Sequence, residues 1–178
     1  MATIITRPQE TEYAPYYHRY VTQVAGNNAL EALQQQVDRI ADLFLSLTPE
    51  QADYRYAEGK WTPKQILLHI IDCERVFSYR AMCIARGESQ PLPGFGEDAY
   101  AEHYNADSRS MQSIVNEYKI GRMSTMALFS DSISDSALSR VGTANNNPVT
   151  PRASAWIVAG HELHHAHILR TKYLGLPE

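Results

Sequence analysis

Four of the seven histidines of this 178-residue chain lie between positions 161 and 167, close to its C-terminal end. Histidines four residues apart on a helix lie on one face, one turn above the other, so two neutral imidazoles can bind the same metal ion. His161 and His165 have this spacing and share a face with the aliphatic residues Val158 and Ile168. Because an apolar face points into the core, the pattern predicts two buried metal ligands.

Residues 161–165 also match H-E-x-x-H, the pattern in which two histidines bind zinc and the glutamate is the general base of a protease. Such proteases need a further ligand downstream and a sheet, whereas position 171 is Thr and no sheet pattern is present. The match therefore indicates a pair of metal-binding histidines, but not a zinc protease. Glu162 is a candidate general base, with the alternative that it orients a histidine or caps a polar group. His164 and His167 fall on a neighbouring stripe and are candidates for hydrogen bonds to the ligands, or for the rim of the site.

A catalytic zinc-type site commonly has three protein ligands and one open position, so a third ligand must come from another segment. His69 lies on the apolar stripe of a predicted helix, beside Ile66 and Ile70. Alone, such a histidine is more often a core residue. Together with the pair on another inward face, it predicts a three-histidine site made by His69, His161 and His165. Cys73 follows His69 by one turn, and is either a buried thiol or a fourth ligand that would make the site structural.

The periodicity of apolar residues predicts four helices, and no strand is expected because almost nothing alternates with a period of two. The helices span about residues 28–46, 62–86, 108–130 and 150–174, and Thr-Pro-x-Gln start signals precede two helical segments at Thr48 and Thr62. The fold class is therefore an all-α four-helix bundle. Residues 87–107 form a connection long enough to cross the bundle, which makes the second and third helices parallel. Residues 1–27 are expected to form an extended lead-in on the surface of a domain at 28–178.

Composition excludes several classes of protein. The net charge of −4 argues against a nucleic-acid partner, which needs a basic surface. No apolar stretch of about 18 residues is present, so no membrane-spanning helix is expected. The polar N-terminus lacks the apolar core of a signal peptide, which predicts a cytoplasmic protein.

Three segments resemble, in order, those of the DinB/YfiT-like family. They are residues 60–75 (KWTPKQILLHIIDCER), 91–95 (PLPGF) and 155–165 (AWIVAGHELHH). The resemblance covers about residues 28–175. It implies a four-helix bundle, often a homodimer, with a divalent Zn²⁺ or Ni²⁺ ion held by His69, His161 and His165.

Two reaction classes suit three imidazoles and an open position. A metal-dependent hydrolase would use a metal-bound water whose pKa falls towards about 7. A thiol-dependent transferase or isomerase would bind a low-molecular-weight thiol as its thiolate. The third alternative is a non-catalytic metal-binding or stress-related protein. For a small-molecule substrate, Arg80 is a candidate for binding a carboxylate, unless it pairs with an acid. Three aromatic residues could form an apolar wall for such a substrate, with ordinary core packing as the alternative: Phe77, Phe95 and Tyr100.

Overall fold

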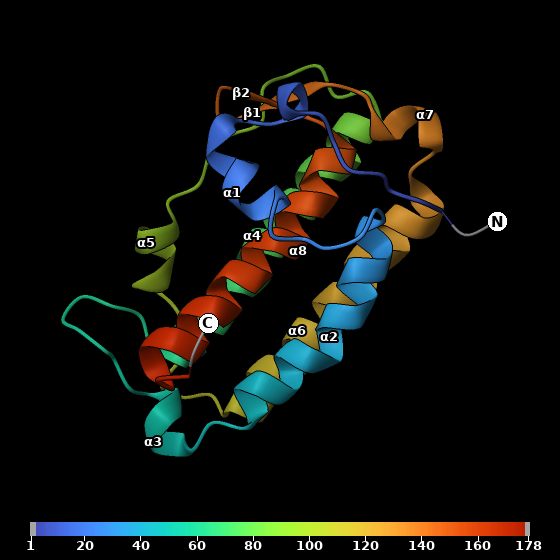
Figure 1. The fold of residues 1–178 in the computed structure, drawn as a ribbon. Helices are drawn as coiled ribbons and strands as arrows, with labels where there is room; N and C mark the ends of the chain where they lie inside the picture. Colours follow the sequence, from blue (N-terminus) through green and yellow to red (C-terminus); the bar gives the residue numbers. More distant parts are fainter. Residues whose placement is uncertain (1–2, 177–178) are drawn as a thin grey trace.

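Four long helices form the body of the computed structural model, which describes residues 3–176 (Figure 1). They are α2 (Ala29–Leu45), α4 (Pro63–Ala85), α6 (Met111–Ala127) and α8 (Pro151–Ile168). Each lies within the range predicted from the apolar periodicity, and the all-α four-helix bundle is confirmed. The short helices are α1 (His18–Val21), α3 (Pro49–Ala52), α5 (Glu97–Ala101) and α7 (Asp135–Leu138). Single 3-10 turns span Glu10–Glu12 and Pro15–Tyr17, and π-helical turns extend α6 over Leu128–Ser132 and α8 over Leu169–Tyr173.

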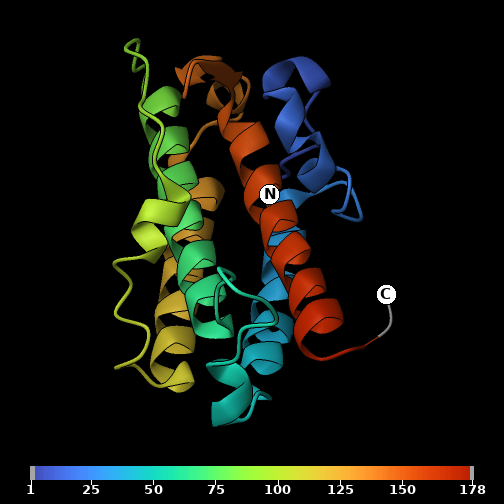
Figure 2. The same cartoon turned by 90° about the vertical axis from the view of Figure 1, so that its left-hand side faces the viewer.

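The helices pack as a ring in which α4 contacts α8 and α6, and α2 contacts the same two helices. Figures 1 and 2 show that α4 and α6 run in one direction, while α2 and α8 run in the opposite direction. The connection over residues 86–110 makes this possible, because it returns along the outside of α4 and carries α5. The predicted crossover between the second and third helices is therefore present.

The starts of α4 and of the short helix α3 follow from local side-chain chemistry. Thr62 caps α4 by accepting a hydrogen bond from the backbone of Gln65, whose side chain accepts one from the backbone of Thr62. Thr48 and Gln51 form the same reciprocal pair at α3. Pro follows each threonine at the first helical position, where its missing N–H has no cost. Both predicted capping boxes are confirmed, and the box at Thr62 sets the register that turns His69 inward.

The expectation of no strands was wrong in one place. Residues Gly142–Ala144 (β1) and Asn147–Val149 (β2) pair as a two-stranded antiparallel hairpin. Asn145 and Asn146 form its turn with positive φ angles of 49° and 61°, which asparagine tolerates better than most residues. Three-residue strands are too short to show alternation. The Asn-Asn pair was the available signal.

The N-terminal segment also differs from the expectation for residues 1–27. Residues 10–21 fold into helical turns, and Ile5 is fully buried. The indole N–H of Trp156 on α8 donates to the backbone oxygen of Ile5 at 3.0 Å. The apolar residues of this segment join the same core cluster as α8, because their aromatic and aliphatic side chains gain more from burial than from exposure. The segment is thus packed into the bundle and is not an extended strap on its surface.

Gly160 allows the closest approach between this segment and α8. A Cβ atom added at Gly160 would lie 2.0 Å from the backbone oxygen of Tyr20. That distance is far below van der Waals contact, so only glycine lets α1 pack here. The adjacent residue on α8 is His161, so the close approach also decides what lies against that imidazole.

Substitution of Gly160 by Ala is expected to destabilise the protein by about 1–3 kcal/mol or more, because the overlap is with backbone. Gly121→Ala is the matched control, since Gly121 lies inside α6 and nothing is within 4 Å of its added Cβ. The control is expected to stabilise by about 0.5–1 kcal/mol, the gain of Ala over Gly in a helix. Urea unfolding of both variants measures this, and equal effects would contradict the close approach.

Glu12 ties the N-terminal segment to the start of α8. Its carboxylate accepts hydrogen bonds from the Arg152 guanidinium at 2.7 and 3.0 Å and from the Thr150 hydroxyl at 2.8 Å. Burial raises the pKa of Glu12, but the hydrogen bonds from Arg152, Thr150 and the Gln9 backbone outweigh this and lower it below 4.5. The charged form of Glu12 therefore stabilises the folded protein.

Glu12→Gln is expected to lower the free energy of unfolding at pH 7 by about 1–2 kcal/mol, because charge-assisted hydrogen bonds are lost. The folded pKa is lowered, so this contribution is complete above the unfolded pKa of about 4.5 and is lost as pH falls through the folded value. Denaturant unfolding at pH 7 and at acid pH should show the two proteins converging. A difference that stays constant with pH would refute the role of the carboxylate.

Candidate metal centre

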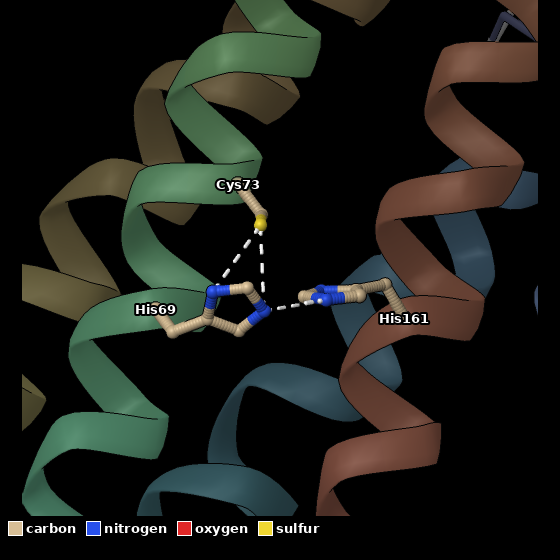
Figure 3. A group of neighbouring side chains, drawn as sticks. All are labelled: His69, Cys73 and His161. Carbon is tan, nitrogen blue, oxygen red and sulfur yellow. Dashed lines mark hydrogen bonds between the residues drawn. The ribbon is translucent and has the colours of Figure 1, made fainter. Parts of the chain in front are cut away.

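Three imidazole nitrogens converge in the interface between α4 and α8. His69 lies on α4, and His161 and His165 lie one turn apart on α8. The Nε2 atom of His161 is 3.0 Å from that of His69 and 3.0 Å from that of His165. Figure 3 shows the rings of His69 and His161 pointing toward one another from the two helices, with Cys73 beside them. The structure thus brings together the three residues that the sequence predicted as ligands.

Burial keeps these imidazoles neutral. His69 is 1% and His161 is 6% exposed, while His165 is half-buried. Burial lowers the pKa of His69 to about 4. Burial and the neighbouring histidines lower the pKa of His165 to about 2, and that of His161 well below 6.5. At neutral pH each ring therefore has a lone pair available for a metal ion.

The spacing of the nitrogens fits a single divalent cation. Two nitrogens bound to one zinc ion at tetrahedral angles lie roughly 3.3 Å apart, and closer at smaller angles. The observed 3.0 Å separations are near this value. Imidazole is a ligand for both Zn²⁺ and Ni²⁺, so the donor set suits either ion.

Cys73 borders the three histidines. Its sulfur lies 3.6 Å from Nε2 of His69, and His69, Cys73 and His161 form a set of donor atoms within 4.8 Å of one another. A nitrogen and a sulfur on one zinc ion lie roughly 3.6 Å apart, so the distance also fits a fourth ligand. Burial, however, raises the pKa of the thiol well above its usual value, which disfavours the thiolate. Cys73 is thus placed to be a ligand only if the metal itself removes the proton.

Aromatic rings hold the imidazoles in place. The ring of Tyr20 packs edge-on against His161 with centroids 5.3 Å apart, and that of Trp61 packs on His69 at 4.7 Å. His164 lies between Tyr20 and His165, at 5.3 and 5.2 Å. His164 therefore packs beside His165 and Tyr20 through its ring, and its role in supporting a metal site stays a prediction. Neither Tyr20 nor Trp61 was predicted as a site residue.

His167 has a different place from the other three histidines of the cluster. It is exposed and lines a groove between α2 and α8 together with Gln36, Arg39 and Arg170. One hundred degrees per residue turns position 167 away from the face of positions 161 and 165. The prediction that His167 supports the ligands finds no support in this geometry.

Glu162 points away from the histidines, into a buried ionic network. Its carboxylate accepts hydrogen bonds from Arg122 at 2.5 Å and from the Tyr118 hydroxyl at 2.6 Å, both on α6. Arg122 also donates to Glu74 on α4 at 2.9 and 3.0 Å, and to the backbone oxygen of Leu33 on α2. Glu162 and Arg122 are fully buried. Because both carboxylate oxygens of Glu162 are engaged in this network, the structure does not support Glu162 as a general base. It agrees with the alternative, in which Glu162 pairs with polar neighbours.

This network contains two carboxylates and one guanidinium. Burial raises the pKa of Glu162, and the Arg122 charge and hydrogen bonds only partly offset the effect. Burial also raises the pKa of Tyr118 far above its usual value, so this hydroxyl stays protonated and donates to Glu162. Arg122 links α6 to α4, α8 and α2, and thereby fixes the helices that carry the three histidines.

The predicted substrate residues are dispersed. Arg80 is 3% exposed and donates to the backbone oxygen of Pro93 at 2.7 Å, so it holds the crossover connection against α4. Phe77 is buried in the core beneath the Arg80 guanidinium. Tyr100 is 47% exposed and packs on Phe95 in the crossover. The structure therefore agrees with a packing role for these residues better than with a role in binding substrate.

A pocket of about 220 Å³ adjoins the centre at His165. Its walls come from the segment before α4, from α5 and from the end of α8. The lining includes Tyr56, Lys60, Trp61, Asp98, His165 and Tyr173. Aromatic walls with a few charged groups are typical of small-molecule sites. The segment between α3 and α4 supplies Tyr56, Gly59, Lys60 and Trp61, none of which the sequence analysis assigned to a site.

Comparison with known proteins agrees with this architecture. Residues 32–169 match the model of the DinB superfamily, and the chain belongs to this family. YfiT from Bacillus subtilis has a similar structure, with a TM-score of 0.69 and 17% sequence identity over 96% of this chain and 94% of that one. YfiT is described as a probable metal-dependent hydrolase with an unusual four-helix bundle topology. No curated protein sequence matches the chain.

Arg122 was missed by the sequence analysis although a signal existed. It follows Tyr118 by four residues, so it lies on the inward stripe of its helix, where a charged residue needs a buried partner. Its two partners lie next to site residues in the sequence, since Glu74 follows Cys73 and Glu162 follows His161. Which carboxylates would meet Arg122 depended on how three helices pack.

Arg122→Met is expected to destabilise the protein by about 3–5 kcal/mol, because it leaves two buried carboxylates without their cation. Lys119→Met on the same helix is the control, since Lys119 pairs with Asp38 at the surface and such pairs contribute about 1 kcal/mol or less. Chemical unfolding of both variants measures the difference. Equal and small effects would show that the Arg122 network does not hold the helices.

Proposed function

We propose that this protein is a metal-dependent hydrolase of a small molecule, and that His69, His161 and His165 hold its divalent Zn²⁺ or Ni²⁺ ion. The proposal rests on the convergence of three neutral imidazole nitrogens. The Nε2 atom of His161 lies 3.0 Å from the Nε2 atoms of both His69 and His165. Membership of the DinB superfamily and the likeness to YfiT, a probable metal-dependent hydrolase, support it.

The chemistry that such an ion supplies is a bound water acidic enough to be deprotonated near neutral pH. The residues of the chain prepare the site for this. Burial keeps the three rings neutral, and Tyr20 and Trp61 fix their orientation by packing. The pocket beside His165 is the place where a small substrate would lie. In this proposal Glu162 is a positioning residue that anchors α8 through Arg122.

Metal content tests the ligand set. Purified protein is expected to bind one Zn²⁺ or Ni²⁺ per chain, and each of His69→Ala, His161→Ala and His165→Ala should lower the affinity by at least about tenfold. His167→Ala is the matched control, because that histidine lies on another face, and it should retain the metal. Atomic absorption after dialysis measures the stoichiometry. Retention of metal by all three alanine variants would overturn the site.

Cys73→Ala decides between an open and a closed site in the same experiment. We expect this variant to keep its metal and its activity. Loss of metal in Cys73→Ala would instead indicate a four-ligand structural site, and with it the non-catalytic alternative.

Activity separates the hydrolase from the thiol-dependent alternative. The metal-loaded protein is expected to hydrolyse small 4-nitrophenyl esters, and His161→Ala should reduce kcat/KM to background. Conjugation of a low-molecular-weight thiol to a model electrophile, without ester hydrolysis, would favour the transferase. A homodimer and a cytoplasmic location stay predictions; no helix within residues 3–176 has the length and apolar character needed to cross a membrane.

A further inference from the structure

Arg19 is an exposed cation at the edge of the metal centre. It lies on α1, and its guanidinium packs over the rings of Tyr16 and Tyr20 at 4.1 and 4.8 Å from their centroids. One N–H of the guanidinium donates to the Tyr20 hydroxyl at 2.9 Å. Within residues 3–176, no carboxylate forms a salt bridge with Arg19.

The position of Arg19 is determined by the buried residue next to it. Tyr20 is 4% exposed and packs against both His161 and His164. The backbone of Tyr20 is held against α8 by the close approach at Gly160. An arginine fixed between two aromatic rings loses less conformational freedom on binding an anion than a free surface arginine does.

Arg19 is connected to the histidines through the ring of Tyr20. The guanidinium of Arg19 packs over that ring at 4.8 Å, and the same ring packs against His161 with centroids 5.3 Å apart. In Figure 2, α1 and α5 flank the α4–α8 pair from opposite sides, and the segment before α4 crosses below. His69 lies on α4, and His161 and His165 lie on α8, so α1 with Arg19 and α5 border the two helices that carry the histidines.

We propose that Arg19 anchors the substrate of this centre by binding a carboxylate that the substrate carries near the hydrolysed bond. This inference rests on the proposed hydrolase function and deepens it, because it restricts the substrate to anionic esters or amides. The guanidinium fork matches the two oxygens of a carboxylate. The substrate-binding arginine that the sequence suggested at Arg80 is engaged with Pro93, and Arg19 supplies that chemistry from the N-terminal segment.

A singly charged carboxylate fits better than a phosphate group. Phosphate sites gather several cations or backbone N–H groups, whereas Arg19 is a single cation and Arg80 nearby is occupied.

Paired esters test the proposal. Mono-4-nitrophenyl esters of succinate, glutarate and adipate each carry a free carboxylate, and alkanoate esters of matching length do not. For the best of the three acids, Arg19→Met in the metal-loaded protein is expected to lower kcat/KM by at least about tenfold, the effect of losing one charge-assisted contact. It should leave the neutral esters within about twofold of the parent. Arg19→Lys, which keeps the charge, should recover part of the loss.

Arg39→Met is the matched control. Arg39 is exposed on α2, lines the groove on the other side of α8, and should change neither class of ester. Equal effects of Arg19→Met on charged and neutral esters, or no effect on either, would overturn the anchor and leave the hydrolase intact. A thermal melt of Arg19→Met checks that the fold is kept, and Arg19→Lys provides the test if it is not.

Binding without turnover separates the two proposals. Calorimetric titration of the metal-loaded protein with glutarate should show binding that weakens at least about tenfold in Arg19→Met. Inorganic phosphate should bind more weakly than glutarate. If no ester is hydrolysed but glutarate binding still depends on Arg19, the hydrolase fails and the anion site stands. Glutarate binding that is equal in the parent and in Arg19→Met would overturn the anchor whatever the activity.

Discussion

Burial of three imidazoles between α4 and α8 is the constraint on which the rest of the structure depends. A buried polar nitrogen without a partner is costly, and here three of them face one another at hydrogen-bonding distance. Neutral imidazoles so placed are accommodated most simply by a shared cation, and the lowered pKa values keep them from taking up protons instead. The antiparallel packing of α4 on α8 must therefore be held closely, since a shift of either helix would separate the nitrogens.

Three consecutive residues of α8 show how that packing is held. Gly160 admits the backbone of α1, His161 faces α4, and Glu162 turns to Arg122 on α6. This is possible because α8 is buried almost all round over residues 153–162, so that successive side chains meet different helices. The Arg122 network is a scaffold in this arrangement, because it joins all four long helices, and it includes Glu162, the residue next to His161. Burying these charges costs free energy. Because Glu162 is next to His161, a change that weakens the network would both destabilise the bundle and move the histidines.

The N-terminal segment lies outside the match to the family model, which spans residues 32–169. It nevertheless packs Tyr20 against His161 and brings Arg19 to the edge of the centre. The histidines come from α4 and α8 within the matched range, and Figure 2 shows α1 and α5 on opposite sides of these two helices. In this arrangement the bundle supplies the three histidines, and the N-terminal segment packs against one of them through Tyr20.

Local patterns in the sequence determined the four long helices, the capping boxes at Thr48 and Thr62, and the inward faces that carry His69, His161 and His165. Helix periodicity places such residues without reference to the rest of the fold. The same patterns could not decide the direction of Glu162, since a residue 100° away from a ligand can face solvent, metal or another helix. They also missed the hairpin at Asn145, which is too short to alternate. The burial of the N-terminal segment was missed as well, although Tyr13, Tyr16, Tyr17 and Tyr20 have the i, i+3, i+4, i+7 spacing of one helical face. Only the tertiary structure decided that Glu162 meets Arg122, that His167 lies apart and that Tyr20 packs on His161. These contacts join residues from different helices, and their partners are selected by how the helices pack.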